Sequence, residues 1–105
     1  VEPQDYARYI YAAAEIASSA GIELAQLNVG GGFPEYYANT EAQPRADYFV
    51  TIAQAHQSAF KDDPPLLMCE PGRAMVARSA SLLCRVIHVR SETSTLFIND
   101  GIYGG

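Results

Sequence analysis

Helical and strand-like segments alternate along the first 70 residues of the sequence. Apolar side chains at three- and four-residue spacing predict helices over residues 4–20 and 45–60. Short apolar runs at 24–29 and 66–70 predict two strands buried in a sheet. Because a helix separates the two strands, we expect them to be parallel, as in α/β proteins.

The pattern changes after Arg73. Residues 83–90 alternate and are rich in β-branched side chains, and residues 95–98 form another strand-like run. Their short polar connection predicts an antiparallel hairpin. We therefore expect an α/β unit over residues 1–75 and the start of a β domain over residues 76–105. Such strands leave sheet edges unpaired, so we expect part of a larger protein or a chain completed by other copies.

Composition and charge exclude several classes of function. A formal net charge of −5 argues against a nucleic-acid-binding protein, which needs a basic patch. No apolar run approaches the roughly 18–20 residues of a membrane helix. Cys69 and Cys84 are expected to be reduced core residues of a cytoplasmic protein. His56 and His88 have no partners at metal-ligand spacing, so no metal site is expected.

Gly30, Gly31 and Gly32 directly follow the first predicted strand. Glycines let the backbone approach a ligand closely and leave N–H groups free for an anion, so this glycine run is a candidate phosphate site. A tight turn from strand to loop explains the same residues equally well. The run is neither a dinucleotide fingerprint, since G-x-G-x-x-G is absent, nor a P-loop, since no Gly-Lys-Ser/Thr follows.

Glu70, Gly72 and Arg73 follow the second predicted strand. A guanidinium binds phosphate through planar, charge-assisted hydrogen bonds. Consecutive parallel strands end at the same edge of a sheet, where α/β barrels carry their functional groups, so we expect this motif beside the glycine run. The alternative is an ordinary strand end with an ion pair between Glu70 and Arg73.

Three stretches resemble the ornithine decarboxylase group of pyridoxal-phosphate-dependent enzymes, at residues 27–34 (LNVGGGFP), 69–74 (CEPGRA) and 99–104 (NDGIYG). The resemblance implies an alanine-racemase-like (β/α)8 barrel, with residues 1–75 as its last two βα units before a C-terminal β domain. It implies pyridoxal 5′-phosphate as the cofactor, a basic amino acid as the small-molecule substrate of the complete enzyme, and a homodimer. The third stretch favours decarboxylation of ornithine to putrescine over the diaminopimelate branch.

The resemblance also implies a role for each motif. The three glycines would bind the cofactor phosphate through backbone N–H groups, and Gly72 and Arg73 would complete that site. Glu70 would contact the pyridine nitrogen. A carboxylate at that position keeps the nitrogen protonated, which makes the ring a better electron acceptor.

Two further residues and one absence follow from the same resemblance. Asp100 and Tyr103 would lie near the subunit interface, although a β-turn after a strand also explains them. The family's enzymes need a Schiff-base lysine on the first barrel strand, which no segment here matches. Lys61, the only lysine, is expected as a solvated charge at the strand end opposite Glu70.

The chain alone is therefore expected to be inactive. Two other hypotheses stay open: a non-catalytic regulatory or binding homologue of the decarboxylases, and a truncated product without independent activity.

Overall fold

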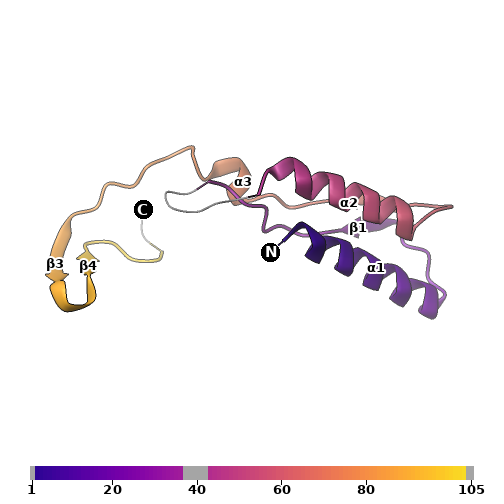
Figure 1. Ribbon diagram of the computed structural model, residues 1–105, viewed down its shortest axis with the longest axis horizontal. Coiled ribbons are helices and arrows are strands. Elements are labelled where there is room, and N and C mark those ends of the chain that lie inside the picture. Colours follow the sequence, from indigo (N-terminus) through magenta and orange to yellow (C-terminus); the bar gives the residue numbers. More distant parts are fainter. Residues whose placement is uncertain (1, 37–42, 104–105) are drawn as a thin grey trace.

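The computed structural model describes residues 2–36 and 43–103 of the chain. The molecule is elongated, measuring 59 × 28 × 24 Å, with the long helices at one end and a β-hairpin at the other (Figure 1). The elements are α1 (Pro3–Ala20), β1 (Gln26–Asn28), α2 (Arg45–Ala59), β2 (Leu66–Met68), α3 (Arg73–Val76), β3 (Val86–Arg90), the 3₁₀ helix η1 (Ser91–Thr93) and β4 (Thr95–Ile98).

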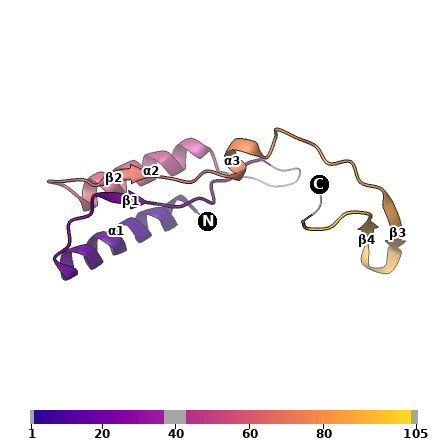
Figure 2. The same ribbon diagram turned by 180° about the vertical axis from the view of Figure 1, so that it is seen from behind.

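Local signals set both ends of α1. Pro3 lies in its first turn, and the Asp5 carboxylate accepts a hydrogen bond from the Glu2 N–H at 2.9 Å. Gly21 ends the helix in the left-handed conformation, with φ of 65°, and its N–H donates to the Ser18 carbonyl at 3.1 Å. The helix therefore begins and ends where the sequence predicts, and it lies beside α2 (Figures 1 and 2).

The two strands β1 and β2 form a parallel sheet, with α2 as the connection between them, which confirms the α/β prediction. The register pairs Gln26 with Leu66, Leu27 with Leu67 and Asn28 with Met68. The backbone pairing continues past the strands, because the Glu70 N–H donates to the Gly30 carbonyl at 2.8 Å.

The buried core lies between α1, α2 and the loop that follows β1. Phe33 is its centre, at 1% exposure, and it stacks on Tyr6 with ring centroids 5.3 Å apart. Tyr48 contacts the Phe33 ring edge-on at 6.4 Å. The cluster comprises Tyr6, Ile10, Phe33, Tyr48, Ile52 and Ala55. Because Phe33 directly follows the glycine run, this core anchors the run to both helices.

Several predicted boundaries and burials were wrong. The strands predicted at 24–29 and 66–70 are confirmed only over β1 and β2. Their predicted burial was wrong: only Leu27 and Leu67 are half-buried and the other strand residues are exposed, because each strand has a single partner strand among the described residues. Cys69 was predicted to be buried but is exposed, since it lies past the end of β2, and Cys84 precedes β3 and is half-buried. The short helix α3 was not predicted. The predicted loop at 33–44 lies partly outside the described residues, and residues 33–36 have no regular structure.

The predicted apolar face of α1 is only partly buried. Tyr6 and Ile10 belong to the core, whereas Tyr9 and Ile16 are 62% and 69% exposed. The reason is that the core residues Phe33 and Tyr48 pack against Tyr6, on the side of α1 that also carries Ile10.

The C-terminal strands β3 and β4 form the predicted antiparallel hairpin. Arg90 pairs with Thr95, and the register shifts between Val86 and His88. The turn is made by η1 and by Ser94, whose φ is 49°. None of the hairpin's residues is buried, and both views place it far from α1 (Figures 1 and 2).

Candidate functional site

The glycine run and Glu70 leave the parallel sheet side by side, as the sequence predicts. Besides the hydrogen bond from the Glu70 N–H to the Gly30 carbonyl, the backbones approach so closely that a Cβ on Gly31 would collide with the Glu70 carbonyl oxygen. Gly31 is therefore required by the contact between two chain segments, independently of any ligand.

Asn28 links the two segments through its side chain. Its Nδ2 donates a hydrogen bond to Glu70 Oε1 at 2.6 Å, and its Oδ1 accepts one from the Gly30 N–H at 2.8 Å. A neutral amide makes both bonds at once because it carries a donor and an acceptor. Sequence reasoning assigned Asn28 no role, although a polar residue at the end of an apolar run was a signal.

The backbone of the glycine run offers unused donors. Gly30 and Gly32 have φ values of 74° and 88°, the left-handed conformation that glycine adopts without strain. Among the described residues, no hydrogen bond involves the N–H groups of Gly31 or Gly32. Two free N–H groups in a loop of left-handed glycines fit an anion such as a phosphate.

Arg73 adds a cation next to this loop. It is exposed at the start of α3, and no ion pair to it occurs in residues 2–36 and 43–103. The alternative of an ion pair between Glu70 and Arg73 is therefore not observed. The Glu70 carboxylate accepts a hydrogen bond from Asn28. A Cβ built on Gly72 would meet no atom of the described residues within 4 Å, apart from its chain neighbours.

Tyr6, on α1, hydrogen-bonds to the backbone of the glycine run. Its hydroxyl donates a hydrogen bond to the Gly31 carbonyl at 2.6 Å. Burial raises the pKa of Tyr6 above 10.0, and the nearby Tyr48 and Cys69 add to the effect. The phenol therefore stays protonated and keeps donating across the physiological pH range.

A second support joins the loop to α3. The Arg45 Nη1 donates to the Ala74 carbonyl at 2.6 Å and lies 3.6 Å from Oε2 of the buried Glu35. The other oxygen of Glu35 accepts the Tyr36 N–H at 3.0 Å. These contacts position the backbone beside Arg73, and sequence reasoning missed both Arg45 and Glu35.

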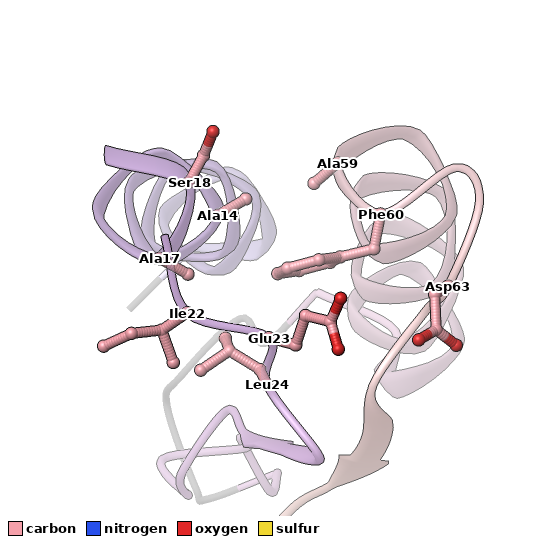
Figure 3. A pocket seen from close by; sticks show the side chains of 9 residues that line it. All are labelled: Ala14, Ala17, Ser18, Ile22, Glu23, Leu24, Ala59, Phe60 and Asp63. Atoms are coloured by element: carbon pink, nitrogen blue, oxygen red, sulfur yellow. The ribbon is translucent and has the colours of Figure 1, made fainter. Parts of the chain in front are cut away.

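The opposite end of the sheet carries a separate cavity of about 210 Å³, between the C-terminal ends of α1 and α2 (Figure 3). The charged side chains lining it are the carboxylates of Glu23 and Asp63. Lys61 is exposed between α2 and β2, at the strand end opposite Glu70, as predicted. The residues that line the cavity therefore offer an anionic ligand no cationic side chain.

The predicted interface residues Asp100 and Tyr103 lie in the segment that follows β4. The Asp100 carboxylate accepts the Gly101 N–H at 2.8 Å, and Tyr103 is 99% exposed. Within the described ranges, no cluster of three or more His, Cys, Asp or Glu side chains fits a metal ion. No helix there is long and apolar enough to cross a membrane.

The glycine turn and Glu70 lie at the carboxyl ends of adjacent parallel strands, where α/β proteins commonly bind their ligands. The family described as "Pyridoxal-dependent decarboxylase, pyridoxal binding domain" matches residues 3–77. The chain belongs to this family of pyridoxal-dependent decarboxylases, which confirms the resemblance.

The relatives include enzymes with different substrates. The chain is 36% identical over 87 residues to diaminopimelate decarboxylase of Actinosynnema pretiosum, covering 79% of the chain and 20% of the relative. It is 35% identical over 94 residues to the chloroplastic ornithine decarboxylase of Nicotiana glutinosa, covering 86% and 20%. The chain thus spans about a fifth of these relatives.

Solved structures agree with the family. Diaminopimelate decarboxylase from Helicobacter pylori, complexed with L-lysine, aligns with a TM-score of 0.65 and 28% identity, over 96% of this chain and 25% of that one. The arginine decarboxylase of Paramecium bursaria Chlorella virus gives a TM-score of 0.65 and 28% identity, over 99% and 29%. The comparisons do not separate the ornithine branch from the diaminopimelate branch.

Proposed function

We propose that this chain is the part of a basic amino acid decarboxylase that holds the phosphate and the pyridine nitrogen of pyridoxal 5′-phosphate. The observation that carries the proposal is the contact of Gly30 and Gly31 with Glu70 at one edge of the parallel sheet. It brings free N–H donors and a carboxylate together, which matches a ligand with a phosphate at one end and a basic ring nitrogen elsewhere.

The roles of the residues follow from their chemistry. The N–H groups of Gly31 and Gly32, with Gly72 and the Arg73 guanidinium, bind the phosphate. Glu70 accepts a hydrogen bond from the pyridine nitrogen and keeps it protonated. When bound, the cofactor accepts the electron pair that remains on the substrate after loss of carbon dioxide. The lysine that anchors the cofactor is supplied by another segment of the complete polypeptide.

We further propose that residues 1–75 are the last two βα units of a (β/α)8 barrel, and that residues 76–105 begin a β domain. The parallel pairing of β1 with β2 and the antiparallel hairpin after it support this division. Ornithine is the proposed substrate, which the stretch at 99–104 and the similarity to plant ornithine decarboxylase support. Asp100 and Tyr103 are proposed to contact the second subunit of a homodimer.

Two substitutions in the complete polypeptide that carries this segment test the proposal. Glu70→Gln is expected to lower carbon dioxide release from ornithine by about 100-fold while pyridoxal phosphate still binds, because only the ring contact changes. Arg73→Ala is expected to weaken cofactor binding by about tenfold, with most of the activity recovered at saturating cofactor. Near-normal turnover of the Glu70 variant contradicts the proposal.

The isolated 105-residue chain provides a complementary test. Carbon dioxide release from ornithine by this chain with pyridoxal phosphate would contradict the proposal that the anchoring lysine lies elsewhere. Release from diaminopimelate but not from ornithine by the complete polypeptide would overturn the substrate assignment alone.

A further inference from the structure

The Asn28 side chain hydrogen-bonds to both halves of the proposed site, to Gly30 and to Glu70. The structure assigns to it the role of a positioning residue: it holds the Glu70 carboxylate where the pyridine nitrogen is bound. This inference rests on the proposed function of Glu70 and adds to it a residue that would not itself touch the reacting atoms.

The geometry of β1 explains why Asn28 reaches Glu70. Asn28 is the last residue of β1 and pairs with Met68, the last residue of β2, and Glu70 lies two residues past the end of β2. The backbone pairing continues past both strands through the bond from the Glu70 N–H to the Gly30 carbonyl at 2.8 Å, so the Glu70 side chain is held near that of Asn28 at the strand ends. The 2.6 Å bond between them follows from this register.

A second hydrogen bond, from the Gly30 N–H, fixes the orientation of the Asn28 amide. Because Oδ1 accepts the Gly30 N–H at 2.8 Å, the amide is fixed with Nδ2 directed at Glu70. Glu70 and Asn28 are both exposed, so without this bond the carboxylate is free to rotate among its rotamers in water. The glycine turn thus helps to orient the acid.

A neutral side chain at position 28 orients the Glu70 carboxylate without neutralising its charge. The carboxylate has to retain its negative charge to stabilise a protonated ring nitrogen. A lysine or arginine at position 28 would compete with the ring for that charge, whereas an amide occupies one lone pair of Oε1 and leaves Oε2 for the cofactor.

The test uses the complete polypeptide as holoenzyme, loaded with pyridoxal phosphate carrying a ¹⁵N label in the ring. The ¹⁵N chemical shift reports ring protonation separately from activity. Asn28→Ala is expected to move this shift toward the unprotonated value and to lower kcat for decarboxylation by about tenfold, with the KM for substrate unchanged. Gln26→Ala, on the same face of β1, makes none of these contacts and is the matched control.

A double substitution separates positioning from general destabilisation. In a Glu70→Gln background, Asn28→Ala is expected to lower kcat by less than about twofold, because the carboxylate that it positions is gone.

The variant Asn28→Asp provides a third test, because it keeps an acceptor for the Gly30 N–H. It is expected to regain activity at low pH, where a proton shared with Glu70 restores the bond, and to lose it at high pH through charge repulsion.

The outcomes distinguish the two proposals. If Glu70→Gln leaves turnover and the ¹⁵N shift unchanged, the proposed function fails. If Glu70→Gln is impaired while Asn28→Ala behaves like Gln26→Ala, only the role of Asn28 is overturned. Equal losses from Asn28→Ala in the two backgrounds, or the same pH profile for the alanine and aspartate variants, also overturn it.

Discussion

The hydroxyl of Tyr6 donates a 2.6 Å hydrogen bond to the carbonyl oxygen of Gly31, so the first helix of the chain directly supports the glycine run. Tyr6→Phe keeps the ring packing on Phe33 and removes only this bond. We expect the free energy of unfolding of the complete polypeptide to fall by about 1 kcal/mol, measured by urea denaturation. Tyr9→Phe, on the exposed side of α1, is the control, and an equal loss there would contradict the assignment.

The buried phenols make stability sensitive to alkaline pH. Burial raises the pKa of Tyr6 and of Tyr48 above 10.0, so between that pH and their folded-state pKa values the folded chain holds protons that the unfolded chain has released. The free energy of unfolding therefore decreases as pH rises above about 10. Denaturation midpoints between pH 8 and 11 should show a shallower decrease for Tyr6→Phe than for the unmodified chain, and identical slopes would disprove the effect.

Gly31→Ala tests the close backbone approach. The added Cβ collides with the Glu70 carbonyl oxygen, which belongs to the backbone and moves only if the ends of β1 and β2 separate. We expect about 2 kcal/mol of destabilisation and weaker binding of pyridoxal phosphate, by thermal melting and cofactor titration. Gly101→Ala, which has open space around it, is the matched control. Full stability of the Gly31 variant would show that the two segments can separate freely.

Phe33→Ala removes the most buried aromatic ring. Its 1% exposure and its stacking on Tyr6 predict a loss of about 3–4 kcal/mol on truncation. Tyr36→Ala removes a ring of the same loop that is 57% exposed, and we expect little change in its melting temperature. Similar melting temperatures for the two variants would contradict the assignment of Phe33 as the centre of the buried core.

Arg45→Ala leaves the buried Glu35 carboxylate without its cation and frees the Ala74 carbonyl. We expect about 2 kcal/mol of destabilisation by urea denaturation, because the buried carboxylate loses its counter-charge and keeps only the Tyr36 N–H as a partner. Arg78→Ala removes an exposed arginine that makes no ion pair in the described part of the chain, so it is the control. Equal effects would show that Arg45 acts only through net charge.

Local patterns predicted the elements that depend on neighbours in the sequence. Pro3 and Gly21 fixed the ends of α1, and the alternation of helix and strand predicted the parallel pairing of β1 with β2. The same reasoning placed Glu70 beside the glycine run, because consecutive parallel strands end together.

Local sequence patterns did not predict the contacts that depend on strand register, or the burial that depends on which segments cover the sheet. Asn28 and Glu70 are 42 residues apart, and their bond exists only in one alignment of the two strands. Cys69 is exposed because burial depends on what covers the end of β2, which periodicity along the chain does not encode. The pairing of Arg45 with Glu35 likewise joins residues that are not adjacent in the sequence.

The parallel pairing of β1 with β2 also determines when the site forms during folding. The glycine turn and Glu70 belong to segments that meet only after the connecting helix α2 has closed the intervening loop, which is a slow, non-local step. No binding surface of this kind exists in the unfolded chain. A ligand that contacts both strand ends therefore binds only the native alignment, and by mass action it raises the population of molecules that have completed that step.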